Sequence, residues 1–247
     1  MKYKDYSPDI WKRLNTTLDQ VLKEDSSPVA AFDADGTLWD IDLGETFFHY
    51  QIDNKLVSLP PHPWEHYETM KAKNAPEAYL WLAQICQGKK LEQVHQWAVD
   101  GVKAASPLPI FLEQKRLIDL FLSKGVRIYI ITASVKWAVE PGVEILGLTK
   151  DNVIGIETEV NEGLISNRQK GLITYRQGKV DALMEITGGK KPFFASGNTM
   201  GDFQLLQSAT HLSLAVSAAS RDDKLFKTEY ELQQNAEKFG WLSHRFV

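Results

Sequence analysis

The sequence predicts an α/β protein with a doubly wound parallel sheet, and two observations carry that prediction. Short apolar runs that end at turns recur along the chain, at 29–32, 126–131, 192–196 and 212–216. Segments with helical periodicity separate these runs. Strands of a parallel sheet are continuously apolar because helices cover both faces of the sheet, so the alternation favours this architecture.

The expected helices follow from apolar residues spaced three and four positions apart. The first places Ile10, Leu14 and Leu18 on one face, ahead of the strand at 29–32. A hairpin is expected over 153–166, where two alternating runs meet at Asn161-Glu162-Gly163. Further helices are expected at 108–123, 135–146, 179–187 and 202–208, and a solvated helix at 229–240.

The stretch from 41 to 106 has a different character because it contains no convincing strand. Its periodic segments at 44–53, 76–86 and 91–104 predict helices, and Ser106-Pro107-Leu108-Pro109 resembles a linker. We therefore predict an α/β core, 1–40 and 107–247, that is interrupted after its first strand by a helical cap, 41–106.

Composition narrows the function classes. Of 247 residues, 43% are hydrophobic and 24% charged, which is typical of a globular protein, and a net charge of −4 gives no basic surface for nucleic acid. The single cysteine, Cys86, excludes an intramolecular disulfide. No apolar run reaches the roughly 18 residues of a membrane span, and the polar first residues lead us to expect no signal peptide. We expect a cytoplasmic protein, monomer or homodimer, without nucleic-acid or membrane partners.

The most informative motif, Asp33-Ala34-Asp35-Gly36-Thr37, directly follows the first strand. Ligands of open parallel sheets bind beyond the carboxyl ends of the strands, and Gly36 allows a sharp turn there. One carboxylate can act as a nucleophile and the other can transfer protons, while Mg²⁺ between them would offset their repulsion. The alternative is a solvated Asp-Gly turn. An EF-hand loop fits poorly, because Gly44 stands where its twelfth residue should be an acid.

Three further polar clusters follow strands or open helices. Thr132, Ala133 and Ser134 precede an expected helix, where free N–H groups bind anions, although Ser and Thr are also ordinary helix caps. Lys179 lies at an expected helix start, where a cation is disfavoured unless an anion is near, although an isolated lysine is more often a surface residue. The segment 196–202 offers oxygens of Asn198 and Asp202 beside two glycines, or forms an ordinary turn.

In combination, this order of acid, hydroxyl, lysine and acid resembles the haloacid dehalogenase-like (HAD) hydrolases. The segment 33–37 is similar to their first motif, Thr132 to the second, Lys179 to the third and 197–202 to the fourth. The resemblance covers about 28–40 and 107–216 and implies a Rossmann-like core. A helical insert directly after the first motif resembles the phosphoserine phosphatase-like subclass with a C1 cap.

The resemblance implies a Mg²⁺-dependent phosphomonoester hydrolase that works through an aspartyl-phosphate. Asp33 would be the nucleophile, Asp35 the general acid and base, and Thr132 and Lys179 would bind the phosphoryl oxygens. This assignment agrees with the chemistry, since phosphoryl transfer depends on positioning and charge neutralisation. The other implied contacts are to substrate, through Gly36, Thr37, Ala133 and Ser134, and to Mg²⁺, through Asp33, Asp35 (its backbone carbonyl), Asn198 and Asp202.

One position departs from the family pattern. The fourth motif of the family usually begins Gly-Asp, whereas here it begins Gly197-Asn198. The carbonyl of Asn198 can ligate Mg²⁺ with one negative charge less, and Asp202 would contribute directly or through water. We therefore predict modest Mg²⁺ affinity and expect Asn198→Asp to strengthen it.

The predicted cap is rich in aromatic residues and carries acids near its start. The resemblance implies that one acid faces a substrate ammonium group; Glu45 is the first candidate and Asp42 the second. Aromatic rings with acids also cage quaternary ammonium groups, although packing between cap helices explains most such rings. The expected substrate is a small phosphorylated metabolite, with amine-bearing esters (phosphoserine-like or phosphocholine-like) slightly favoured.

Two alternatives stay open at this point. The same fold supports phosphoryl transfer to another acceptor, as in mutases. A catalytically inactive protein that binds a phosphorylated ligand is weakly favoured by Asn198, and the presence of Asp33, Asp35, Thr132 and Lys179 argues against it. Dehalogenation is disfavoured because that chemistry has no evident need for Asp35 or a metal.

Overall fold

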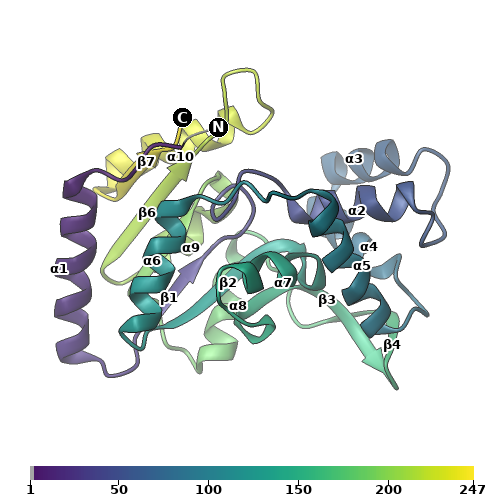
Figure 1. The fold of residues 1–247 in the computed structure, drawn as a ribbon, viewed down its shortest axis with the longest axis horizontal. Helices are drawn as coiled ribbons and strands as arrows, with labels where there is room; N and C mark the ends of the chain where they lie inside the picture. The colour runs from purple at the N-terminus through teal and green to yellow at the C-terminus, as the bar shows by residue number, and fades with distance from the viewer. Residues whose placement is uncertain (1–2) are drawn as a thin grey trace. The chain divides into compact units, whose positions relative to one another are not determined.

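The computed structural model describes residues 3–247 and confirms the predicted α/β architecture (Figure 1). Its seven-stranded sheet has the order β4-β3-β2-β1-β5-β6-β7. The strands are β1 (Val29–Phe32), β2 (Arg127–Val135), β3 (Val153–Asn161), β4 (Leu164–Lys170), β5 (Phe194–Gly197), β6 (Leu212–Ser217) and β7 (Leu242–Arg245). The chain divides into two compact units. The first comprises the described residues up to Asp40, with Pro109–Ile131 and Arg176–Val247; the second comprises Ile41–Leu108 and Thr132–Tyr175.

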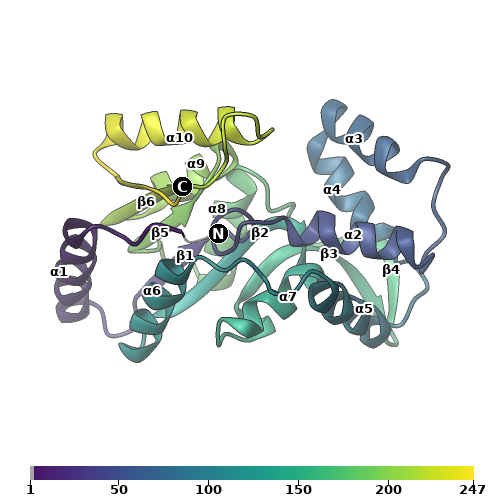
Figure 2. The ribbon, with the colours of Figure 1, turned by 45° about the horizontal axis from the view of Figure 1, so that its top comes forward.

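The first unit contains a parallel sheet in which β1 is central, with β2 on one side of it and β5 on the other. Phe32 of β1 pairs with Ile130 of β2 on one side and with Ser196 of β5 on the other, both in parallel. Its helices are α1 (Pro8–Glu24), α6 (Leu112–Ser123), α8 (Gln177–Thr187), α9 (Phe203–Ser208) and α10 (Phe226–Phe239). Figure 2 shows α9 and α10 on one face of the strands and α1 and α6 on the other. Connections between parallel strands of one sheet are almost always right-handed. The helices of connections that lead to one side of β1 therefore cover one face of the sheet, and those of connections that lead to the other side cover the opposite face.

The interior of the first unit is aromatic. Phe32, Phe121 and Phe194 are fully buried, and their ring centroids lie 5.3–6.2 Å apart. Leu232 and Ala236 of α10 are buried as well, and α10 packs on β6. The expectation of a fully solvated helix at 229–240 is therefore wrong, because one face of α10 covers the sheet.

The second unit has its own apolar core. Phe47, Phe48 and Tyr67 pack there with Trp137 of α7 and Ile156 of β3. Its helices are α2 (Leu43–Asp53), α3 (Pro63–Lys73), α4 (Ala75–Gln84), α5 (Leu91–Ala104) and α7 (Lys136–Ile145). The segment 41–108 thus shares a core with 132–175. The division into a core and a separate cap at 41–106 stays a prediction.

The element boundaries differ from the prediction at a few places. β2 continues to Val135, four residues beyond the predicted end, and α7 starts at Lys136. The hairpin turn lies where it was predicted, between β3 and β4. The sequence did not indicate α3 or β7, and the short 3-10 helices η1 (Lys150–Asn152) and η2 (Met200–Asp202) also appear. Across residues 3–247, each helix is too short or too polar to cross a bilayer.

Candidate active site

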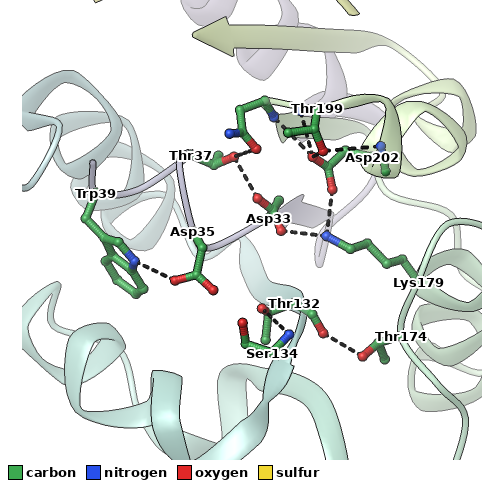
Figure 3. A network of polar contacts seen from close by, with 12 residues as sticks. Asp33, Asp35, Thr37, Trp39, Thr132, Ser134, Thr174, Lys179, Thr199 and Asp202 are labelled. Atoms are coloured by element: carbon green, nitrogen blue, oxygen red, sulfur yellow. Dashed lines mark hydrogen bonds and ion pairs between the residues drawn. The ribbon is translucent and has the colours of Figure 1, made fainter. Parts of the chain in front are cut away.

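Asp33, Lys179 and Asp202 form a buried ionic network in the first unit. Asp33 follows β1 directly, where its N–H donates to the carbonyl of Ser196 at 2.9 Å. Lys179, from the first turn of α8, donates through Nζ to Asp33 Oδ1 at 2.5 Å and to Asp202 Oδ1 at 2.6 Å (Figure 3). These three residues are 6%, 3% and 2% exposed, respectively. The network confirms that residues far apart in the sequence meet at the carboxyl ends of β1 and β5.

Burial and charge act together on the ionisation of this network. Burial raises the pKa of the Asp33 carboxyl to about 7; the charge of Asp202 adds to that shift and Lys179 opposes it. Burial acts to lower the pKa of Lys179, but the charges of Asp202 and Asp33 outweigh it and raise that pKa above its usual value. Lys179 therefore stays protonated near neutral pH, and the two carboxylates justify a cation at a helix start.

The loop after β5 is ordered around Asp202. Its Oδ2 accepts from the N–H groups of Asn198 and Thr199, each at 3.1 Å, while its Oδ1 accepts from Lys179. A Cβ at Gly197 would lie 2.4 Å from Cβ of Asp202, so the close approach requires glycine. Both oxygens of the Asp202 carboxylate are engaged by protein donors, which makes this acid an organiser of the loop.

Asn198 connects the aspartate turn to α10. Its Oδ1 lies 3.4 Å from the hydroxyl of Thr37, which donates to Asp33 Oδ2 at 2.9 Å. Its Nδ2 donates to Oε1 of Glu229 at 3.0 Å. Gly36, with φ of +74°, makes room for it, because a Cβ there would lie 2.0 Å from Nδ2 of Asn198. The sequence reasoning missed Glu229, which lies beyond the part of the chain that resembles the family motifs.

Asp35 occupies an environment different from that of Asp33. It is half-buried, and its Oδ1 accepts from Nε1 of the fully buried Trp39 at 2.9 Å. Two carboxyl groups two residues apart are therefore held in unlike surroundings, one buried and one half-buried. Such a difference separates a nucleophile from a proton-transfer group.

The second predicted cluster lies in the second unit, along the end of β2. Thr132 and Ser134 lie within the strand, which ends later than predicted; the helix expected to follow them, α7, begins two residues after Ser134. The N–H of Ser134 donates to Oγ1 of Thr132 at 3.0 Å, and the Thr174 hydroxyl donates to the carbonyl of Thr132 at 2.5 Å (Figure 3). Ala133, between them, is half-buried. Thr174, 1% exposed, was not identified from the sequence.

The acids at the start of 41–106 have partners in the second unit. Asp42 caps α2, because its Oδ1 accepts from the N–H of Glu45 at 2.7 Å. Glu45 Oε1 lies 2.7 Å from Nζ of Lys71. That ammonium also lies over the rings of Tyr67 and Tyr79, 5.2 and 5.9 Å from their centroids. The chain's own lysine thus takes the acid-and-aromatic surroundings that the sequence suggested for a substrate ammonium.

Most aromatic residues of 41–106 pack against one another. The ring of Phe48 has its centroid 5.5–6.4 Å from those of Trp64, Tyr67 and Trp81. Phe47, Phe48 and Tyr67 are buried in the core of the second unit. This packing accounts for the aromatic content that favoured an ammonium cage in the sequence.

The side-chain oxygens of Asp33 and Asn198, in the first unit, are of the kind that a hard cation prefers. Asp33 Oδ2 and Asn198 Oδ1 both lie beside the hydroxyl of Thr37. Within residues 3–247, no group of three or more His, Cys, Asp and Glu gathers as a metal site. A site of one carboxylate and neutral carbonyl oxygens suits Mg²⁺, which keeps several waters and takes few protein ligands. The residues present therefore fit Mg²⁺.

The central strand of the parallel sheet ends at a buried aspartate beside a lysine, at the kind of topological switch point where open α/β sheets bind ligands. The chain belongs to the haloacid dehalogenase-like hydrolase (HAD) family, whose model matches residues 30–207. The predicted family is thereby confirmed. No curated protein matches the chain.

Solved structures with low sequence identity have the same fold. A functionally unknown protein from Anaerococcus prevotii DSM 20548 is similar over 98% of this chain and 95% of its own, with 14% identity and a TM-score of 0.75. A cytosolic 5′-nucleotidase IIIB bound to cytidine is similar over 95% of this chain and 86% of its own, with 10% identity and a TM-score of 0.61. A substrate-bound phosphoserine phosphatase is similar over 77% of this chain and 86% of its own, with 14% identity and a TM-score of 0.51. These likenesses establish the fold.

Proposed function

We propose that the protein is a Mg²⁺-dependent phosphomonoester hydrolase that works through an aspartyl-phosphate on Asp33. One observation carries the proposal: a buried carboxylate held by Lys179 at 2.5 Å and by Thr37 at 2.9 Å, with a second, more exposed acid two residues further on. Membership of the HAD hydrolases and the fold shared with a phosphoserine phosphatase and a nucleotidase support a phosphatase.

The chemistry uses the two aspartates in turn. A carboxylate oxygen of Asp33 attacks phosphorus, the bond from phosphorus to the ester oxygen breaks, and Asp35 donates its proton to the leaving alkoxide. Asp35 then takes a proton from water as that water attacks phosphorus. The bond to Asp33 breaks, which releases inorganic phosphate and returns both carboxyl groups to their starting states.

The remaining residues supply charge and position. Lys179, fixed between two carboxylates, would offset charge on the transferring phosphoryl group, and Trp39 orients Asp35. Asp33, the backbone carbonyl of Asp35 and Asn198 would hold Mg²⁺, with Asp202 behind them. Mg²⁺, when bound, supplies further neutralisation of the phosphoryl oxygens. Substrate contacts by Thr132, Ala133, Ser134, Gly36 and Thr37 stay predictions of the family resemblance.

The substrate class is a small phosphorylated metabolite. The preference for amine-bearing esters rests on Glu45, whose carboxylate is already paired with Lys71. A substrate ammonium would have to compete with that lysine, so the structure weakens this preference relative to neutral or acidic leaving groups.

Phosphate release from a broad panel of phosphomonoesters tests the proposal. Wild-type protein with Mg²⁺ is expected to release phosphate from at least one ester, and chelation of the metal by EDTA or the substitution Asp33→Asn should abolish the release. Asp19→Asn, at an exposed position of α1, is the matched control and should retain full activity. Equal turnover by wild type and Asp33→Asn would refute the covalent mechanism. Binding of phosphorylated ligands without turnover would favour the inactive binding protein, and transfer to an alcohol acceptor in preference to water would favour the phosphotransferase.

A further inference from the structure

Glu229 is a buried acid on α10 with no part in the proposed reaction. It is 2% exposed, and its Oε2 accepts from the N–H groups of Ala218 and Ala219 at 3.0 and 2.9 Å. Its Oε1 accepts from Nδ2 of Asn198 at 3.0 Å. An ionised carboxylate is an acceptor only, so each group that faces it must be a donor.

This requirement fixes the orientation of the Asn198 side chain. An asparagine amide presents donors at one end and an acceptor at the other. Because Nδ2 meets Glu229, Oδ1 is directed to the other side, 3.4 Å from the Thr37 hydroxyl that bonds Asp33. Turning the amide by half a rotation would bring its oxygen against the carboxylate of Glu229, which is unfavourable between two buried acceptors.

We propose that Glu229 is a positioning residue, which holds the amide of Asn198 so that its oxygen faces Thr37 and Asp33 as a metal ligand. The inference rests on the proposed function and adds a residue that the motif comparison did not include. The pair of Asn198 and Glu229 carries one negative charge and places it on α10, behind the position where the family motif usually has its acid.

The arrangement changes what Asn198→Asp should do. In the single variant, two carboxylates would lie about as close as Nδ2 and Oε1 do now, at 3.0 Å, and would repel each other. Adding Glu229→Gln removes that repulsion. The introduced glutamine can keep its oxygen on the two N–H groups and donate its amide to the introduced aspartate, so the double variant reverses the hydrogen bond and retains the net charge. The expected gain in Mg²⁺ affinity therefore needs both substitutions.

Glu229→Gln alone has the opposite consequence. The glutamine oxygen stays with Ala218 and Ala219, because these N–H groups need an acceptor. Its amide then donates toward Asn198, which must turn its oxygen to α10 and its Nδ2 toward Asp33. The metal side loses an oxygen ligand and gains a donor.

Four proteins and one control test the proposal: wild type, N198D, E229Q, the double variant and Thr228→Val. Thr228 accepts from the N–H of Met200 at 3.0 Å, so T228V loosens the same helix and loop without touching Asn198. Three readouts are measured: thermal unfolding without metal, Mg²⁺ affinity by calorimetry, and the side-chain amide resonances that N198D removes from the NMR spectrum.

We expect E229Q to shift the Asn198 amide resonances and to weaken Mg²⁺ binding about tenfold or more, the usual effect of losing an outer-shell partner. N198D should lower the unfolding temperature; the double variant should restore it and bind Mg²⁺ more tightly than wild type. T228V should lower the unfolding temperature and leave Mg²⁺ affinity unchanged.

Unshifted amide resonances in E229Q, or additive unfolding effects in the double variant, would overturn the proposed orientation. Absence of Mg²⁺ binding by wild type would instead overturn the proposed function and the role of Glu229 at the metal, and the other two readouts would still measure the orientation.

Discussion

Each unit of the molecule contains a lysine bound to carboxylates, and the two arrangements differ in burial. Lys179 has a side chain only 3% exposed and touches both Asp33 and Asp202. Lys71 has a side chain 28% exposed and forms a 2.7 Å pair with Glu45, 14% exposed. Removing Lys179 would leave the buried carboxylates of Asp33 and Asp202 without their ammonium partner. Removing Lys71 would leave a carboxylate that water can reach. The same residue types are thus held in different surroundings, and the difference in burial predicts different consequences when each lysine is removed.

Lys179→Met should have the largest effect. Breaking a buried ion pair by removing one partner costs about 3–5 kcal/mol. Urea unfolding is therefore expected to show a large loss of free energy of unfolding, and phosphate release should disappear. Lys71→Met provides the comparison; if both variants lost the same stability, burial would not be what distinguishes the two arrangements.

Gly36→Ala should rank second. The new Cβ would lie 2.0 Å from Nδ2 of Asn198, at a backbone φ of +74°. Overpacking costs about 1–3 kcal/mol and the left-handed backbone about 1–2 kcal/mol. Gly125→Ala is a matched control, because Gly125 has φ of +73° and a Cβ added there would have nothing within 4 Å. Thermal and urea unfolding should show the larger loss for G36A, and equal losses would contradict the close approach of Asn198.

Trp39→Phe should have an intermediate effect on stability and a specific one on catalysis. The variant loses the Nε1 donor to Asp35, and a net hydrogen bond to a charged group is worth about 1.5–3 kcal/mol. We expect kcat to fall because Asp35 is no longer oriented for proton transfer. Trp11→Phe removes a comparable bond, 2.6 Å from Nε1 to Glu113 Oε2, away from the aspartates. A fall in kcat of the same size in W11F would show that only stability is affected.

Lys71→Met should have the smallest effect on stability, about 1 kcal/mol or less for a partly exposed pair. It also tests the substrate preference, because it removes the lysine that a substrate ammonium would have to displace from Glu45. If Glu45 receives an ammonium group, kcat/KM for phosphoserine or phosphocholine should rise in K71M relative to a neutral ester. An unchanged ratio would remove the reason for favouring amine-bearing substrates.

Much of the fold could be predicted from the sequence. The strands β1, β5 and β6 are apolar runs bounded by turn residues, and the helices around them show clear periodicity. β7, with the sequence Leu-Ser-His-Arg, has no apolar run and forms because it pairs with β6. The end of β2 was misplaced because Thr132 and Ser134 resemble helix caps, whereas the strand continues to Val135.

The candidate site could be predicted only in part. Motif spacing identified Asp33 and Lys179. In the structure, Nζ of Lys179 lies 2.5 Å from Oδ1 of Asp33. Glu229 and Trp39 carry no motif, because their roles depend on which atoms meet after folding. Glu45 was chosen because the family resemblance implies an acid soon after the first motif, and the sequence did not indicate that Lys71 would bind it. Local patterns predict which residues point to a strand end, but not which partner neutralises them.

Trapping the phosphorylated enzyme tests the central claim most directly. With an activated aryl phosphate, whose leaving group needs no proton from Asp35, the Asp35→Asn variant should accumulate the intermediate because the base for its hydrolysis is missing. Peptide mass spectrometry after acid quench should then find one phosphoryl group on the peptide that contains Asp33, and none in Asp33→Asn/Asp35→Asn. Phosphate release by the double variant at the rate of Asp35→Asn, with no phosphorylated peptide in either, would contradict the account.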